Sequence, residues 1–518
     1  MQILSNKKRP SPVAFYIILL AFNANHGIIK IKVIYFILLL ALILRLPLLN
    51  GSFWLDEAAQ FLESARPLSQ QLNIVDDFQP PLMHLLTFFS IRLGNLFGLS
   101  QTEWFLRLIP SLIPGILTIW ALYRLALLIT NRKIALLSIL FLATSSFHIF
   151  YSQELRPYSL PALWGILATW QMLLLIKNKA QKPLILFIIF SILGLYSSYL
   201  YPFLLIGQFL YLLKEKFSFP KILVSGGMII ASFLPWLSKF LEQLQAGQVL
   251  RLSMPGWSET VSLPIFKTAL ILPLKFVFGV ADLEMNLAYA FLALIVFVPL
   301  AYLFFLSLRQ KQKNLGFFFC ILFLPLLLSW LVSFFIPVLQ AKRVLFLLPI
   351  FALLEASLAM TYAQKKPHLV KIFVSAILII NLFSTVAYWR KPQLQRENWR
   401  DLTQEISTKF PKKETAVVFS FAHPFAPWQF YAQEDFKTFS SGVYYFSDLK
   451  NPAETFKGLS DYSYVLVFDY LRDLTDPNDL ILKTVRDLGF KEVGVLDYPN
   501  IGFVRIYTLD NIIIARVK

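Results

Sequence analysis

GIIKIKVIYFILLLALILRLPLLNGSFWLDEA, residues 27–58, decides the fold class of this chain. Its first part, Gly27 to Leu49, is apolar and long enough to cross a lipid bilayer as a helix. An acidic pair, Asp56 and Glu57, follows directly. Carboxylates at the mouth of a membrane helix bundle are costly unless they face water or a partner. The stretch therefore predicts a membrane protein with a functional site near Asp56 and Glu57.

The composition extends this prediction to most of the chain. The 518 residues are 57% hydrophobic and only 15% charged, and long apolar runs recur up to about residue 389. Such a composition is typical of proteins with several transmembrane helices. The single cysteine, Cys320, excludes an intramolecular disulfide and a cysteine-based metal cluster.

The positive charge is unevenly distributed. The net charge is +18, and residues 1–389 carry 31 basic against 13 acidic residues, whereas residues 390–518 carry 17 of each. In a membrane protein, an excess of Lys and Arg marks the cytoplasmic loops. The distribution therefore predicts cytoplasmic loops and phosphate-binding sites, and no nucleic-acid partner.

Placing every basic cluster on the cytoplasmic side predicts 11 spanning helices. They cover residues 30–49, 107–129, 133–151, 158–177, 183–199, 200–213, 221–239, 287–308, 315–336, 343–362 and 369–388. Two further apolar stretches, Pro81–Leu99 and Leu263–Gly279, would break the alternation, so we expect them to lie on the outer membrane surface. The alternative, in which both cross the membrane, gives 13 spans.

The spans divide the chain into three parts. Residues 1–29 are expected to form a cytoplasmic or interfacial leader, and residues 30–389 a transmembrane catalytic domain whose first outer loop is 50–106. Residues 390–518 alternate strand-like runs (416–421, 464–468, 492–496 and 503–507) with helical patterns (399–410 and 477–488). This alternation predicts a small soluble α/β domain on the extracytoplasmic side.

The predicted outer face collects acidic and basic residues. They are Asp56, Glu57, Asp76, Asp77, Arg107, Glu154, Arg156, Tyr158, Lys342 and Arg343. Lys342 and Arg343 oppose the positive-inside bias, and an anionic ligand such as a lipid phosphate explains them. The alternative is that both side chains extend to lipid headgroups.

Carboxylates beside phosphate-binding cations at one membrane face fit sugar transfer from a lipid-linked donor. A carboxylate would remove the proton from an acceptor hydroxyl as that hydroxyl attacks the anomeric carbon. Arginines would stabilise the departing phosphate. A transporter or channel could also gather charges at its vestibule, so the residues alone leave both functions open.

Four motifs carry a family resemblance. Leu55-Asp56-Glu57, Gln79-Pro80-Pro81-Leu82, the run from Trp104 to Leu108 and the run from Gln153 to Tyr158 resemble bacterial members of glycosyltransferase family 39. That family is similar to protein O-mannosyltransferases and to the aminoarabinose transferase of lipid A. The resemblance covers about residues 30–390. It implies a GT-C fold, a polyprenyl-phosphate-linked sugar donor and an inverting reaction on the extracytoplasmic face of the plasma (inner) membrane.

The resemblance also implies roles for the outer residues. Asp56 is the expected general base, with Glu57 as its catalytic neighbour. We expect the donor phosphate to contact Arg107, Arg156, Lys342 and Arg343. Asp76, Asp77, Glu154 and Tyr158 are expected to shape the sugar and acceptor site, and the acceptor is a lipid, a glycan or a protein.

The chain departs from the family at Gln79, where the family often has His before the Pro-Pro pair. The departure puts metal dependence by analogy in doubt. No cofactor and no metal site are predicted, and no ligand spacing indicates a divalent cation. The expected partners are the donor, the acceptor and membrane lipids.

Each candidate also has a structural alternative. Asp56 could only cap the helix that follows it, and Glu57 could only favour the helix dipole. Asp76 and Asp77 could be ordinary loop acids, and Glu154 could pair with Arg156.

At the level of the whole protein, the main alternative is a lipid or glycan transporter or flippase without transferase activity. The chain shows no internal symmetry of the kind that transporters often have. A glycan polymerase or ligase would use a large outer loop between later helices, whereas the largest outer loop here precedes the second span.

Overall fold

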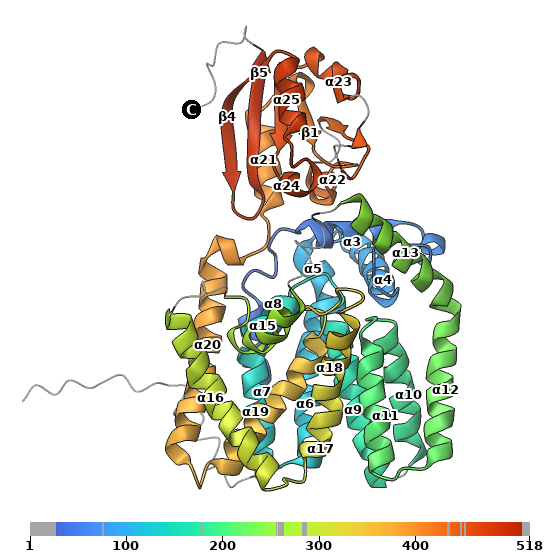
Figure 1. The fold of residues 1–518 in the computed structure, drawn as a ribbon, viewed down its shortest axis with the longest axis vertical. Coiled ribbons are helices and arrows are strands. Elements are labelled where there is room, and N and C mark those ends of the chain that lie inside the picture. The colour runs from blue at the N-terminus through green and yellow to red at the C-terminus, as the bar shows by residue number, and fades with distance from the viewer. Residues whose placement is uncertain are drawn as a thin grey trace, which may run out of the picture.

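The protein consists of a helical bundle with a small sheet domain at one end (Figure 1). The computed structural model describes residues 27–74, 77–178, 180–254, 256, 264–281, 287–432, 436–445, 448–449 and 452–509. Most of the expected leader, and Asp76, lie outside the described residues.

The bundle places a helix in each of the 11 predicted spans. These helices are α2 (Gly27–Arg45), α6 (Ile113–Ile129), α7 (Arg132–Thr144), α9 (Ser159–Asn178), α10 (Gln181–Leu195), α11 (Tyr201–Lys214), α12 (Phe219–Phe233), α16 (Leu287–Arg309), α18 (Leu324–Val332), α19 (Leu348–Tyr362) and α20 (Pro367–Arg390). By length and composition, seven helical runs of the described chain are able to cross a membrane, and three more apolar helices are shorter. The chain is a multi-pass membrane protein, and the count of 11 stays a prediction.

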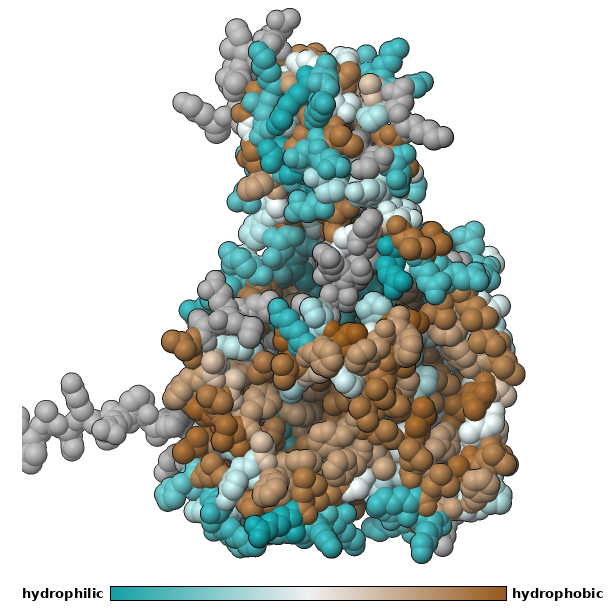
Figure 2. Space-filling view, viewed as in Figure 1, coloured by the Kyte–Doolittle hydropathy of each residue, from teal (hydrophilic) through white to brown (hydrophobic). Residues whose placement is uncertain are grey.

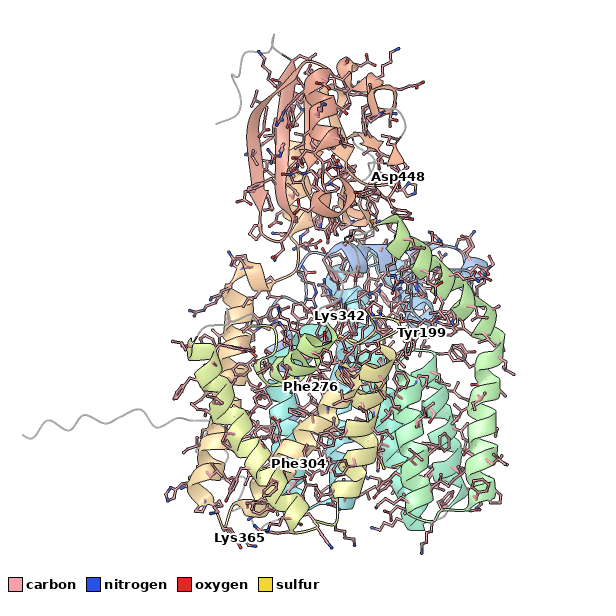
Figure 3. All side chains as sticks on the ribbon, viewed as in Figure 1. Tyr199, Phe276, Phe304, Lys342, Lys365 and Asp448 are labelled. Atoms are coloured by element: carbon pink, nitrogen blue, oxygen red, sulfur yellow. The ribbon has the colours of Figure 1, made fainter. Side chains whose placement is uncertain are left out.

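The surface of the bundle agrees with this assignment. Figure 2 shows a broad hydrophobic belt over the helices, with hydrophilic residues at the far end and over the sheet domain. At the far end, the Lys214 side chain lies close to Gly316, and Asn314 donates a hydrogen bond to the Ile129 carbonyl (2.8 Å). Lys365 lies at the same end, away from Lys342 (Figure 3). The loops with positive charge therefore share one end of the bundle, as the charge pattern predicts.

The opposite end carries shorter helices beneath the sheet domain. These are α3 (Leu55–Ala65), α4 (Leu82–Asn95), α5 (Glu103–Arg107), α8 (Ser146–Tyr151), α13 (Leu237–Ser253) and α15 (Ile265–Phe278) (Figure 1). α4 and α15 contain 14 residues each and are not among the seven candidate spans. They lie in the stretches 81–99 and 263–279, for which the sequence predicts surface helices.

Several helices differ from the predicted ends of their spans, and two of the differences bear on the site. The helical run that contains α12 continues through η3 (Leu234–Trp236) to the end of α13, beyond the predicted end at residue 239. α6 is continuous with α5 through a π-helical turn, η2 (Leu108–Leu112), which begins directly after Arg107. A π turn within a helix is often a functional feature, and here it follows a residue of the candidate site.

The C-terminal domain is built on a five-stranded sheet of order β2-β1-β3-β5-β4. β1 (Thr415–Phe419) pairs in parallel with β2 (Lys437–Ser440) and β3 (Tyr464–Phe468), whereas β5 (Gly502–Leu509) is antiparallel to β3 and to β4 (Phe490–Tyr498). Helices α21 (Trp399–Lys409), α22 (Ala426–Tyr431), α24 (Arg472–Thr475) and α25 (Leu480–Asp487) accompany the sheet. All four predicted strands and both predicted helices are confirmed. The sequence missed β2, whose four residues Lys-Thr-Phe-Ser carry no apolar run.

Aromatic side chains form the centre of this domain. The Phe468 ring stacks on Trp399 (centroids 5.5 Å apart, 15° between planes) and on Phe419 (5.1 Å, 20°). All three side chains are fully buried. Stacked rings add to the free energy that their burial contributes, so Phe468 joins β3 to the helix that begins the domain.

We expect Phe468→Ala to destabilise the C-terminal domain by about 3–5 kcal/mol, because it removes a buried ring and leaves a cavity. Limited proteolysis of the full-length protein would show this as faster cleavage within residues 399–509. Phe503→Ala is the matched control, since Phe503 is 45% exposed on β5. Equal protection of both variants would contradict the central role of Phe468.

Candidate active site

Helix α3 carries Asp56 at the end of the bundle that lies beneath the C-terminal domain (Figure 1). The buried residues of α3 are Glu57, Ala58, Gln60, Phe61 and Ser64, which recur at helical spacing and form one face. Asp56 lies outside that face and is half-buried. Within the described part of the chain, its carboxylate has no hydrogen bond and no ion pair.

The alternative that Asp56 only caps α3 is wrong. The N-cap position is Trp54, which makes no side-chain cap hydrogen bond, and Asp56 lies in the first turn. The first intrahelical hydrogen bond runs from the Ala58 N–H to the Trp54 carbonyl (3.0 Å). The Asp56 carboxylate is therefore available to a ligand.

Glu57 points the other way, into a buried ion pair with Arg107. Arg107 Nε donates to Glu57 Oε1 (2.8 Å) and Arg107 Nη2 to Glu57 Oε2 (2.6 Å), and both side chains are fully buried. Glu57 Oε1 also accepts the Leu155 N–H (2.6 Å). Carboxylate oxygens held by this many donors are not free to remove a proton from an acceptor, so the geometry does not support Glu57 as a catalytic residue.

Arg107 uses all its donors inside the protein. Besides Glu57, it donates from Nη1 to the carbonyls of Leu49 and Gly51 (2.7 Å each) and from Nη2 to that of Ser52 (3.2 Å). A guanidinium has five N–H donors, and each has an acceptor here. Its predicted contact with the donor phosphate is therefore not supported, because no N–H is left for an anion.

Lys342 and Arg343 lie on the other side of Asp56, in the chain between α18 and η5 (Leu345–Leu347). The Lys342 ammonium lies 5.5 Å from the centroid of the Trp54 ring and 5.9 Å from that of Tyr158, which places it between two aromatic side chains. Arg343 is exposed and donates to the Pro337 carbonyl (3.3 Å). Tyr158 and, after it, Asp56 raise the pKa of Lys342. Desolvation lowers the pKa of Arg343, and Tyr158 and Asp56 oppose this effect.

A third cation, Arg156, reaches the site from the loop before α9. It makes two hydrogen bonds with Asp77, from Nη1 to Oδ2 (2.9 Å) and from Nη2 to Oδ1 (3.1 Å). Burial opposes ionisation of Asp77, but Arg156 and His84 outweigh it and lower the pKa of Asp77 below its usual range. Asp77 is therefore not an isolated loop acid. It positions a guanidinium on which Asp56 also acts electrostatically.

One alternative was that Glu154 pairs with Arg156, but among the described residues Glu154 pairs with Arg396 instead. Its Oε2 accepts from Arg396 Nη2 (3.1 Å). Burial raises the pKa of Glu154, partly offset by Arg396. The loop comes close to α6 because Gly115 has no Cβ, which would lie 2.4 Å from Ser152 Oγ.

Arg396 is a site residue that the sequence analysis missed. It lies in the linker that follows the last membrane helix, where it contacts Glu154 and lies 3.6 Å from Glu57 Oε2. Its guanidinium also lies over the Phe150 ring (4.1 Å) and donates to the Phe150 carbonyl (2.8 Å). No local motif marks this arginine, because Phe150 and Glu154, its partners in the site, lie more than 240 residues away.

The side chain of His84 lies beside Gln79. Its Nε2 lies 3.0 Å from Gln79 Nε2 and 3.4 Å from Asp77 Oδ2, and its Nδ1 lies 2.8 Å from Gln60 Nε2. The imidazole ring of His84, on α4, thus lies next to the Gln79 side chain. Among the described residues, no group of three or more His, Cys, Asp and Glu side chains could hold a metal ion.

The site as a whole brings Asp56, Asp77, Glu154, Arg156, Tyr158, Lys342 and Arg343 to one end of the bundle, with Glu57 and Arg107 buried beside them. Figure 3 shows Lys342 at this end, beneath the C-terminal domain. Several buried polar atoms around Asp56 lack a hydrogen-bond partner in the described part of the chain: Trp54 Nε1, Gln79 Oε1, Glu154 Oε1 and Arg156 Nε. Buried polar groups usually have a hydrogen-bond partner, so these four atoms are available to a polar ligand.

The site thus combines a half-buried carboxylate with nearby cations at one end of a membrane helix bundle. Residues 79–238 match a family model described as dolichyl-phosphate-mannose-protein mannosyltransferase. The matched segment includes Arg107, Glu154 and Arg156. No curated protein matches the chain.

Solved structures show the same fold. ArnT from Cupriavidus metallidurans bound to undecaprenyl phosphate is 11% identical, with a TM-score of 0.53 over 94% of this chain and 99% of that one. The archaeal oligosaccharyltransferase AglB from Archaeoglobus fulgidus, in complex with an inhibitory peptide and a dolichol-phosphate, is 13% identical, with a TM-score of 0.51 over 94% and 75%. The predicted fold class and the predicted resemblance are confirmed.

We expect Glu57→Gln to lower the free energy of unfolding by about 3–5 kcal/mol, because it leaves the buried charge of Arg107 without its partner. A thermal unfolding curve of the purified protein measures this loss. Glu242→Gln is the control, since Glu242 and Lys239 form an exposed pair (2.6 Å) whose expected contribution is about 1 kcal/mol or less. An unchanged unfolding temperature for Glu57→Gln would contradict the structural role.

Proposed function

We propose that this protein is an inverting membrane glycosyltransferase that moves a sugar from a polyprenyl-phosphate carrier to an acceptor hydroxyl, with Asp56 as general base. The observation that carries the proposal is the position of Asp56, whose carboxylate has no partner among the described residues while Arg156, Lys342 and Arg343 lie within its electrostatic reach. The family match and the fold similarity support the same class of enzyme.

The reaction follows from this arrangement. The Asp56 carboxylate takes the proton of the acceptor hydroxyl, and the hydroxyl oxygen attacks the anomeric carbon. The bond between that carbon and the phosphate oxygen breaks, and its electron pair leaves with polyprenyl phosphate. The cations stabilise the negative charge that develops on the phosphate. Attack opposite the leaving group inverts the anomeric configuration.

The aromatic residues and Glu154 complete the site in this proposal. Trp54 and Tyr158 fix the Lys342 ammonium between their rings. Glu154 Oε1 and Trp54 Nε1 are free to bond sugar hydroxyls within the described structure. Asp77 fixes the guanidinium of Arg156 by two hydrogen bonds. Each group thus has a separate task in holding the sugar phosphate next to Asp56.

An apolar cavity offers space for an isoprenoid chain. It has a volume of about 390 Å³ between α10, α11 and α12, and its lining includes Leu205, Phe209 and Ile229. Tyr199 is among its lining residues and donates to Gln243, whose side-chain amide in turn donates to the Asp77 carbonyl (2.9 Å). These hydrogen bonds connect the cavity lining to the loop that carries Asp77, the partner of Arg156.

The orientation in the membrane forms part of the proposal. The N-terminus and the loops with positive charge would face the cytoplasm, whereas Asp56 and the C-terminal domain would face the extracytoplasmic side of the plasma (inner) membrane. The charge bias of the loops supports this orientation. The similarities to known proteins lend no support to the transporter or flippase alternative.

We expect Asp56→Asn to reduce sugar transfer by at least 100-fold, because an amide cannot accept the proton. Purified wild-type and variant proteins would be incubated with a panel of polyprenyl-phosphate sugars and with lipid, glycan and peptide acceptors. The measured quantity is the rate of polyprenyl phosphate release.

Glu63→Gln is the matched control for Asp56→Asn, because Glu63 lies on the same helix, where it pairs with Arg66 (2.7 Å). We expect this variant to keep wild-type activity, and both variants to keep the wild-type unfolding temperature. Full activity of Asp56→Asn would exclude Asp56 as the base.

Lys342→Gln should lower kcat on the order of 100-fold, because it removes one charge that stabilises the departing phosphate. The same release assay measures the effect. Lys365→Gln is the control, since Lys365 lies at the opposite end of the bundle (Figure 3). Equal rates for the two variants would remove Lys342 from the proposed phosphate site.

A further inference from the structure

The C-terminal domain and its linker bind the segment that leads into α3. Four residues of this segment, between Asn50 and Leu55, form hydrogen bonds with the domain or the linker. Arg400 Nη2 donates to the Asn50 carbonyl (3.2 Å), and the Arg400 backbone N–H donates to Ser52 Oγ (3.2 Å). The Phe53 N–H donates to Tyr431 Oη (2.7 Å). The fourth residue, Leu55, is bound by Glu397.

Glu397 supplies the cap that α3 lacks. The amides in the first turn of a helix have no intrahelical acceptor, and the N-cap residue Trp54 provides none. Glu397 Oε2 accepts the Leu55 N–H (3.2 Å). A carboxylate at this position is also favoured by the positive end of the helix dipole. The turn that carries Asp56 is therefore capped by a residue more than 340 positions away in the chain.

The Glu397 carboxylate is itself held firmly. Oε2 accepts from Trp399 Nε1 (2.7 Å) and Oε1 from Tyr470 Oη (2.7 Å), and the residue is 9% exposed. Both donors belong to the aromatic core of the C-terminal domain. The cap is thus fixed to the folded domain and does not depend on a flexible surface side chain.

Two further contacts support the same attachment. The Phe430 ring of α22 lies between Phe53 and Phe61, with centroid distances of 5.2 Å and 4.7 Å. Arg396, directly before Glu397, binds Glu154 on the other side of the site. The dipeptide Arg396-Glu397 therefore connects both sides of the site to one domain.

We propose that the C-terminal domain is a positioning element of the transferase, and that Glu397, by capping α3, fixes the turn from which Asp56 reaches the acceptor. This inference rests on the proposed role of Asp56 as the base. Glu397 acts through α3 and contacts no substrate. A small displacement of a reacting group lowers the rate of a reaction far more than it lowers binding.

The test compares Glu397→Ala and Glu397→Gln with the wild type, all as full-length protein. We expect Glu397→Ala to lower kcat by about tenfold to 100-fold, with the KM for the polyprenyl-phosphate sugar changed by less than about threefold. Glu397→Gln retains an oxygen that can accept the Leu55 N–H, so its kcat should lie between those of Glu397→Ala and the wild type. Glu405→Ala is the control, because Glu405 lies on α21 and bonds only within the domain, to Lys409 and Tyr498, among the contacts the structure describes.

Hydrogen exchange gives a readout that does not depend on activity. In Glu397→Ala, a peptide covering residues 53–58 should exchange about tenfold faster at the Leu55 amide than in the wild type, because its acceptor is gone. Glu405→Ala should leave this exchange unchanged. If Glu397→Ala does not fold, Glu397→Gln supports the inference by an intermediate exchange rate and contradicts it by the wild-type rate.

The outcomes separate the two proposals. An active wild type, an inactive Asp56→Asn and full kcat in Glu397→Ala would overturn the positioning role and leave the proposed function standing. A wild type that releases no polyprenyl phosphate would overturn the proposed function, and the exchange rate at Leu55 would still decide whether Glu397 caps α3. Unchanged exchange in Glu397→Ala overturns the cap in either case.

Discussion

The buried ion pair between Glu57 and Arg107 holds the outer end of this protein together. Arg107 binds the carbonyls that follow α2, and Glu57 binds the Leu155 amide before α9, so the pair connects segments from three parts of the chain. Two charges removed from water are stable only when every lone pair and proton finds a partner. That condition fixes the direction of α3, and the position of Asp56 depends on it.

Asp56 and Glu57 are adjacent, but they have different surroundings because neighbouring side chains on a helix point in different directions. Successive side chains on an α-helix are rotated by about 100°. Glu57 therefore points into the buried ion pair with Arg107, and Asp56 lies outside the buried face of α3. The division explains how a site can keep one carboxylate without a partner. The neighbouring ion pair provides rigidity, and Asp56 takes no part in it.

Hydrophobic periodicity and charge bias predicted the bundle well, because burial in lipid and the positive-inside bias act on local composition. The strands of the C-terminal domain are predictable because their short apolar runs are also a local feature of the sequence. The direction of individual side chains was not predictable in this way. The sequence predicts roles in the reaction for Glu57 and Arg107. The directions of these two side chains depend on tertiary contacts, which the sequence pattern does not reveal. Arg396 and Glu397 were missed because the composition change after Tyr388 placed them in a separate domain, whereas both face the membrane site.

The cap provided by Glu397 has a consequence for the way the protein is made. Helix α3 emerges early in synthesis, but its cap and the partner of Glu154 come from residues that follow the last membrane helix. Until those residues are synthesised and folded, the first turn of α3 lacks the Glu397 acceptor for the Leu55 amide. Activity would therefore begin only when the last quarter of the chain is in place, so that a truncated or half-inserted chain could not transfer sugar at the wrong time.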